Sequence, residues 1–200
     1  VGINKQLENR MLLNYITLGY VQNPAEKSQT FFKDIFSLPP SHYLIYYKDE
    51  LQVEPYWNID KQQTIEISQQ EAEERLVQLL TESVTRRLRS DVPVGISLSG
   101  GLDSASLLSL MHSLQGDTKA FSATFPSFEK NEAGLIDILS QQFGTSLHTV
   151  IPNEAELISD FEKLMYHQEE PFPSSSVYAQ YQVFKLAKEQ GINVLMLSLI

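Results

Sequence analysis

Apolar residues recur at two alternating spacings along the chain from residue 69 onward. Segments with an apolar residue every three or four positions, typical of one helix face, alternate with short runs rich in β-branched and aromatic residues, typical of strands. Helices are predicted at residues 69–89, 105–115, 132–143, 153–165 and 176–190, and strands at 92–98, 119–125, 147–150 and 192–197. This alternation predicts an α/β fold, a doubly wound parallel sheet with helices on both faces.

The helix at residues 69–89 has the clearest end signals. Ser68 and Glu71 have the spacing of a capping box, acidic residues follow in the first turn, and Arg86 and Arg87 lie in the last turn, as the helix dipole favours. Its predicted buried stripe is Ala72, Leu76, Leu79, Leu80, Val84 and Leu88.

A small helix plus β-hairpin segment precedes this region. Residues 4–18 have helical spacing until Asn23 and Pro24 break the pattern. Two aromatic-rich runs, 42–47 and 51–57, predict the hairpin, and Pro55 indicates an edge strand. We expect its aromatic side chains to pack against a neighbouring domain; a carbohydrate or nucleobase platform is the alternative.

The strongest candidate site follows the apolar run at residues 94–98. Ser99-Gly100-Gly101-Leu102-Asp103-Ser104 joins this predicted strand to a helix. Such a loop directs backbone N–H groups and the positive end of a helix dipole to one point, which favours phosphate. It is neither a Walker loop nor a dinucleotide fingerprint. The alternative is a plain turn in which Asp103 or Ser104 caps the helix.

Residues 92–104 resemble the pyrophosphate loop of the ATP pyrophosphatase superfamily and, with their flanks, most resemble glutamine-dependent asparagine synthetase. The resemblance covers roughly residues 15–198 and implies an adenine nucleotide alpha hydrolase-like fold. It implies that a carboxylate, aspartate foremost, attacks the α-phosphorus of ATP and that ammonia then displaces AMP. The implied nucleotide-binding residues are Leu98, Ser99, Gly100, Gly101, Leu102, Asp103, Ser104 and Ala123, and Asp103 is also the expected Mg²⁺ ligand.

Adenine requires an apolar slot with hydrogen-bonding groups at its edge. By position, Ser97, Phe121 and Ser122 are further candidates for this slot, although packing within a buried sheet explains them equally well. Residues 169–172, Glu-Glu-Pro-Phe, resemble an Asp-Glu-Pro-Phe segment that lies beside the active site in the family. Glu replaces the first Asp here, which favours a solvated loop for Glu169.

Two departures from the family limit the expected activity. Residues 18–21 and 35–44 resemble the end of an amidotransferase domain, but the chain contains no cysteine, so the glutaminase nucleophile is missing. After Ser198, Leu199 and Ile200 stand where the family has a glycine-rich acidic loop. We therefore predict an amidotransferase remnant at 1–60 and part of a synthetase domain at 61–200. The catalytic residues remain unknown, and the chain alone is not expected to turn over.

Charge and composition limit the kinds of partner that the chain is expected to bind. A net charge of −10 argues against non-specific nucleic-acid binding, and no apolar run reaches the roughly 20 residues of a membrane span. We expect a cytoplasmic protein that uses ATP, Mg²⁺, aspartate and ammonia from glutamine, with a homodimer left open. The alternatives are another acceptor, as in β-lactam, NAD or GMP synthetases, and a non-catalytic nucleotide-binding protein.

Overall fold

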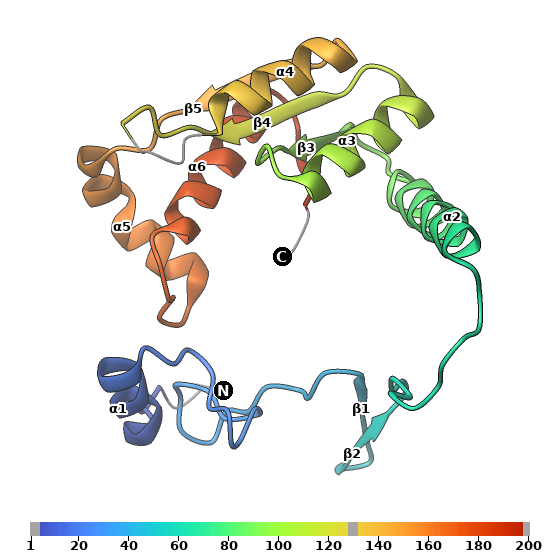
Figure 1. The fold of residues 1–200 in the computed structure, drawn as a ribbon. Helices are drawn as coiled ribbons and strands as arrows, with labels where there is room; N and C mark the ends of the chain where they lie inside the picture. The colour runs from blue at the N-terminus through green and yellow to red at the C-terminus, as the bar shows by residue number, and fades with distance from the viewer. Residues whose placement is uncertain (1–4, 128–131, 198–200) are drawn as a thin grey trace. The chain divides into compact units, whose positions relative to one another are not determined.

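The computed structural model describes residues 5–127 and 132–197, which form two compact units (Figure 1). The first unit comprises residues up to Glu66 together with His167–Ser174. The second comprises Ile67–Tyr166 and the chain from Ser175 onward. The assignment of residues 1–60 to an amidotransferase remnant stays a prediction.

The second unit is built on a four-stranded parallel sheet, as the alternation of strands and helices predicted. Its strands lie in the order β5 (Ser146–Val150), β4 (Lys119–Ala123), β3 (Val94–Ser97) and β6 (Val194–Met196). The helices between them are α3 (Leu102–Gln115), α4 (Ala133–Phe143), α5 (Glu154–Gln168) and α6 (Ser176–Glu189). The chain runs outward from β3 to β5 and then returns to place β6 on the other side of β3. The loop after β3 therefore lies where the strand order reverses, the usual ligand position in open α/β sheets.

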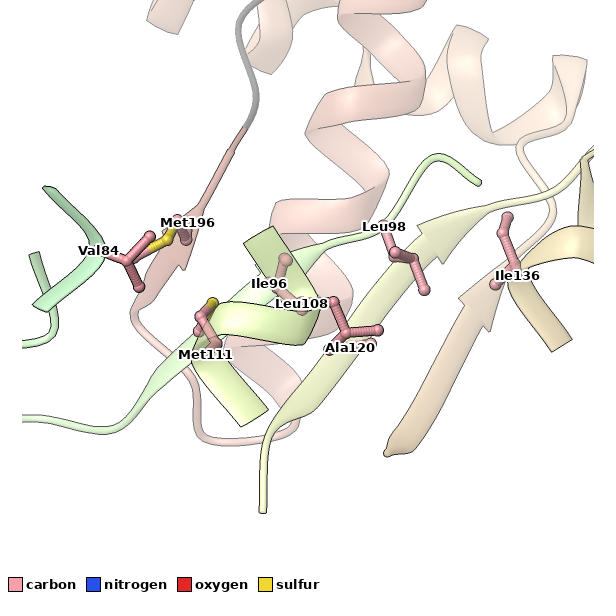
Figure 2. Packing of buried hydrophobic residues seen from close by; sticks show 8 residues of the cluster. All are labelled: Val84, Ile96, Leu98, Leu108, Met111, Ala120, Ile136 and Met196. Atoms are coloured by element: carbon pink, nitrogen blue, oxygen red, sulfur yellow. The ribbon is translucent and has the colours of Figure 1, made fainter. Parts of the chain in front are cut away.

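The two faces of this sheet bury separate apolar clusters. Ile96, Leu98 and Ala120 pack with Leu108 and side chains from α2, α3, α4 and β6, as Figure 2 shows. The opposite face carries the second cluster, composed of Phe121, Val183, Ala187 and Ile192. Ala120 and Phe121 are neighbours that face opposite ways, as the period of a strand requires. Each fully buried large apolar side chain contributes about 1.5–3 kcal/mol, so helices on both faces hold β3 and β4 in place.

Helix α2 (Gln69–Arg87) confirms the capping box but only part of the predicted buried stripe. The Ser68 hydroxyl accepts from the Glu71 N–H at 3.2 Å, and the Glu71 carboxylate accepts from the Ser68 N–H at 2.8 Å. Only Val84 is buried, whereas Leu76 and Leu79 are 58% and 48% exposed. The prediction is confirmed for Val84 and Leu88 and wrong for the earlier positions, because α2 joins the apolar cluster through its C-terminal turns alone. No helix in the described parts of the chain is both long and apolar enough to span a membrane.

The first unit contains α1 (Asn9–Leu18) and a hairpin of β1 (His42–Tyr47) and β2 (Glu50–Pro55). Helix α1 begins later than predicted because Leu7 forms an isolated β-bridge with Phe32. It ends at Leu18, as predicted, and its C-cap residue Gly19 has a φ of +70°, which suits glycine. The hairpin is confirmed. Lys48 and Asp49 form its turn, both with positive φ, as the turns that match strand twist require.

Candidate functional site

The loop after β3 enters helix α3 earlier than the sequence indicated. Helix α3 begins at Leu102, and Gly101 is its N-cap residue, without a side-chain cap. The alternative in which Asp103 or Ser104 caps the helix is therefore wrong, because both lie in its first turn. At the other end of the loop, the Leu98 N–H donates to the Phe121 carbonyl at 2.8 Å. The loop is thus anchored to β4 on one side and to a helix N-terminus on the other.

Ser104 fastens the loop from within. Its buried hydroxyl accepts from the Ser99 N–H at 3.3 Å and donates to the Gly101 carbonyl at 3.1 Å. The Ser99 and Ser104 hydroxyl oxygens are 3.1 Å apart. These bonds close the turn across residues 99–104. Ser99 itself is exposed, so a ligand can reach the loop from that side.

The two glycines of the loop are needed for different reasons. Gly100 has a φ of +76°, and a Cβ there would lie 3.1 Å from Cβ of Glu132. Any other residue would be strained at this position. Gly101 has an ordinary φ of −75°, and an added Cβ would meet nothing closer than the Ser99 hydroxyl at 3.5 Å. The fold therefore requires glycine at 100 but tolerates a side chain at 101.

A cavity of about 280 Å³ adjoins the loop. It is lined by Ser97, Leu98, Ser99, Ser122, Ala123, Phe125, Glu132, Ser176, Ala179, Gln180 and Val183. The structure thus brings together Leu98, Ser99 and Ala123, three of the predicted nucleotide-binding residues. Phe121 is outside the cavity: it is fully buried in the core and stacks on His148 with ring centroids 5.2 Å apart.

Sequence reasoning missed two parts of this cavity. Glu132 lies against Gly100, and Ser176, Ala179, Gln180 and Val183 form one face of α6. Their spacing of three or four residues was the available signal, but only the packing of α6 against β4 shows which face meets the loop. The Gln180 side-chain nitrogen, Nε2, is buried without a hydrogen-bond partner among the described residues.

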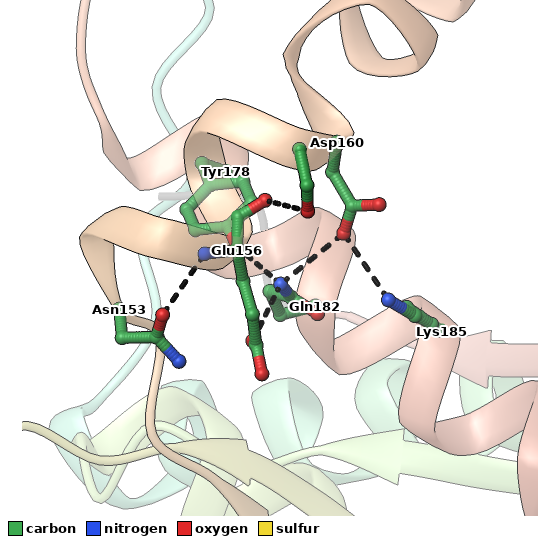
Figure 3. A network of polar contacts seen from close by, with 7 residues as sticks. Asn153, Glu156, Asp160, Tyr178, Gln182 and Lys185 are labelled. Atoms are coloured by element: carbon green, nitrogen blue, oxygen red, sulfur yellow. Dashed lines mark hydrogen bonds and ion pairs between the residues drawn. The ribbon is translucent and has the colours of Figure 1, made fainter.

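A polar network fixes α6 against α5 (Figure 3). The buried Gln182 amide donates to the Glu156 carboxylate at 3.2 Å and also to the Tyr178 hydroxyl. Lys185 forms an ion pair with Asp160 at 3.1 Å. The hydrogen bond to Asp160 raises the pKa of the Lys185 ammonium above its ordinary value. These contacts hold α6 in the rotation that presents Gln180 to the cavity.

Leu102 and Asp103 lie on a different side of the loop from the cavity. Leu102 is 82% exposed, so its backbone N–H rather than its side chain is the candidate ligand. Asp103 lines a second cavity of about 460 Å³ with Met196, Leu197 and residues of α2 and α3. Among the described residues no side chain pairs with its carboxylate, and no three potential metal ligands cluster. A single free carboxylate fits Mg²⁺, which usually takes one or two from the protein and completes its shell with phosphate and water.

The sequence also predicted two features away from the loop, a Glu-Glu-Pro-Phe segment beside the active site and a departure from the family at the end of the chain. The segment at residues 169–172 belongs to the first unit, where the Glu170 carboxylate accepts from the Phe31 N–H at 3.1 Å. The Tyr15 hydroxyl donates to the Phe172 carbonyl at 3.2 Å. Glu169 is exposed, with a φ of +60°. The expected departure at Leu199 and Ile200 lies outside the described residues.

Comparison with known proteins gives a consistent family. The asparagine synthase family model matches residues 75–198. The amidase chyE of Penicillium rubens is 30% identical over 84% of this chain, and the amidase chry2 of Gibberella zeae is 30% identical over 82%. The glutamine-hydrolysing asparagine synthetase 3 of Bacillus subtilis is 29% identical over 70% of the chain.

The alignments cover only part of each relative. They span 28%, 27% and 25% of the lengths of these three proteins. The family match includes the sheet, the loop and α6, which are the elements that build the candidate site. This chain belongs to the asparagine synthase family.

Proposed function

We propose that residues 99–104 hold the pyrophosphate part of ATP in an amide-forming synthetase. The observation that carries this proposal is the contrast between the two loop glycines. Packing explains Gly100, but no neighbouring atom explains why residue 101 lacks a side chain. An open backbone at a helix N-terminus provides the close approach that a polyphosphate needs.

The proposed reaction begins when a substrate carboxylate oxygen bonds to the α-phosphorus of ATP. The bond from that phosphorus to the bridging oxygen breaks, and its electron pair leaves with pyrophosphate. Negative charge grows on the leaving group, where the N–H groups of Gly100, Gly101 and Leu102 are placed to stabilise it. Ammonia then attacks the acyl carbon, AMP leaves and an amide remains.

Ser99 and Asp103 take different roles in this proposal. The exposed Ser99 hydroxyl donates to a phosphate oxygen, while Ser104 holds the loop in shape. Asp103 would hold Mg²⁺, which supplies positive charge to the phosphates when bound. As an anion, Asp103 does not favour phosphate by itself, so its free carboxylate supports a cation-binding role.

The proposed acceptor is aspartate, and the proposed nitrogen source is ammonia released from glutamine elsewhere, since this chain contains no cysteine. The name of the Bacillus subtilis relative supports this choice. Two relatives are named amidases, which favours testing other carboxylates in the same assay. Because the chain spans about a third or less of these relatives, we propose that it supplies the ATP site and does not turn over alone.

Product analysis on the complete gene product tests the reaction. With Mg²⁺, ATP, ammonium and L-aspartate, we expect AMP and pyrophosphate in equal amounts, together with asparagine. A Gly101→Val variant should lose AMP formation, whereas Gly134→Val, on the exposed face of α4, should retain it. Formation of ADP in place of AMP would refute the mechanism. AMP formation with another carboxylate but not with aspartate would refute the acceptor.

A further inference from the structure

The first three turns of α2 expose an apolar stripe. Leu76 is 58% exposed and Leu79 is 48% exposed. Helix α2 joins the apolar cluster of its own unit through Val84 and Leu88, which lie on another side of the helix. The exposed stripe has the spacing of a coiled-coil seam, with alternate steps of four and three residues at Ala72, Leu76, Leu79 and Ser83.

Charged residues flank this seam in an order that makes α2 self-complementary. Glu73 and Arg87 lie along one flank, with Leu80 midway between them. Arg75 and Glu82 lie along the other flank. All four charged side chains are exposed, and the polar contacts that they make among the described residues lie within α2. Each flank thus has one acid and one base, on opposite sides of the middle of the helix.

We propose that α2 is a docking surface for α2 of a second copy of this chain, in an antiparallel pair. With a two-fold axis near Leu79, Glu73 of each copy faces Arg87 of the other, and Arg75 of each copy faces Glu82 of the other. A parallel pair would instead bring the two acidic first turns together, which repels. This inference goes beyond the proposed ATP-binding function and does not rest on it.

The seam is short, so the dimer is weak. Residues 72–83 extend over only about 17 Å at 1.5 Å per residue. A contact of that length between two helices covers less than the roughly 800 Å² per partner of a standard interface. The net charge of −10 on each copy adds repulsion that the paired flanks only partly offset. We therefore expect a transient dimer with a dissociation constant on the order of 100 µM.

Sedimentation velocity over a range of chain concentrations, with charge-reversal variants, tests the inference. We expect the unaltered chain to shift from monomer to dimer as its concentration rises. Glu73→Arg turns two attractive pairs of the dimer into repulsive ones, and Arg87→Glu does the same. Each variant should therefore dimerise at least about tenfold more weakly than the unaltered chain.

An equimolar mixture of these two variants is the decisive sample. One chain then has a base at both ends of the flank, and the other has an acid at both ends. The mixture should form heterodimers about as readily as the unaltered chain dimerises, and the double variant Glu73→Arg/Arg87→Glu should dimerise again. Association through another apolar surface would not follow this pairing of charges.

Glu74→Arg is the matched control. It reverses a charge in the same helical turn as Glu73→Arg, but residue 74 is exposed on the opposite face of α2. It should change the dissociation constant by less than about twofold, because the neutral outcome of a surface substitution away from the contact is small. Leu79→Ala should weaken the dimer about tenfold, since the side chain is lost from both copies at the middle of the seam. Far-UV circular dichroism should be the same for all variants.

Two results would overturn the inference. A chain that stays monomeric up to millimolar concentration would show that the stripe serves another partner or none. Dimers of equal strength in the unaltered chain, Glu73→Arg and Arg87→Glu would show that the copies associate through a different surface.

Discussion

Ser104→Ala tests whether the loop is held in shape from within. The substitution removes the hydroxyl that accepts from the Ser99 N–H at 3.3 Å and donates to the Gly101 carbonyl. That carbonyl keeps another donor, the Ala105 N–H at 3.0 Å, so the loss falls mainly on the Ser99 N–H. Leaving a part-buried donor unpaired costs about 1–3 kcal/mol, and water reaching the exposed Ser99 favours the lower half of that range.

We therefore expect Ser104→Ala to lower the free energy of unfolding by about 1–2 kcal/mol. Ser106→Ala is the matched control on the same helix, because its hydroxyl donates only to the Leu102 carbonyl one turn earlier. Alanine is the better helix former, so this control should be neutral or slightly stabilising. Urea unfolding followed by far-UV circular dichroism measures both. A difference below about 0.5 kcal/mol between the two variants would refute the bracing role, because surface substitutions without a specific structural role usually stay within that range.

Two further predictions concern backbone strain and pH. Gly100→Ala should lower the free energy of unfolding by about 1–3 kcal/mol in urea unfolding, because residue 100 has a positive φ and its Cβ would approach Glu132. Gly101→Ala should change it by no more than about 0.5 kcal/mol. Equal effects of the two substitutions would contradict the conclusion that the fold requires glycine only at residue 100. The hydrogen bonds from the Ser68 hydroxyl and N–H lower the pKa of Glu71 below its ordinary 4.5. The stabilisation from a lowered carboxyl pKa is present above pH 4.5 and is lost as pH falls through the folded-state pKa. The urea midpoint should thus decline more steeply below pH 4.5 for the unaltered chain than for Glu71→Gln, and parallel curves would exclude this contribution.

The sequence predicted the α/β class because buried parallel strands and amphipathic helices have different periods. It also predicted the capping box at Ser68, since that motif is entirely local. It did not predict how little of α2 is buried. Leu76 and Leu79 have the spacing of a buried face, but burial depends on which turns another element covers.

The candidate site was predictable where it is continuous in sequence. Residues 99–104 contain both the glycines and the hydroxyls of the turn. Glu132, the N-cap residue of α4, and Gln180 of α6 come to it through tertiary packing, and neither carries a local motif. The start of α3 at Leu102 was also missed, because Gly101 can serve as an N-cap without any side-chain signal.

Calorimetric titration with Mg·ATP tests the central claim most directly. We expect saturable binding by the unaltered chain and by Gly134→Val, and at least about tenfold weaker binding by Gly101→Val, a difference of about 1.4 kcal/mol. Residue 101 has an ordinary backbone conformation and open space, so this variant should still fold. Loss of binding with an unchanged circular dichroism spectrum would support phosphates at residues 99–104. Equal affinity in Gly101→Val, or no binding by the unaltered chain at millimolar ATP, would contradict the account.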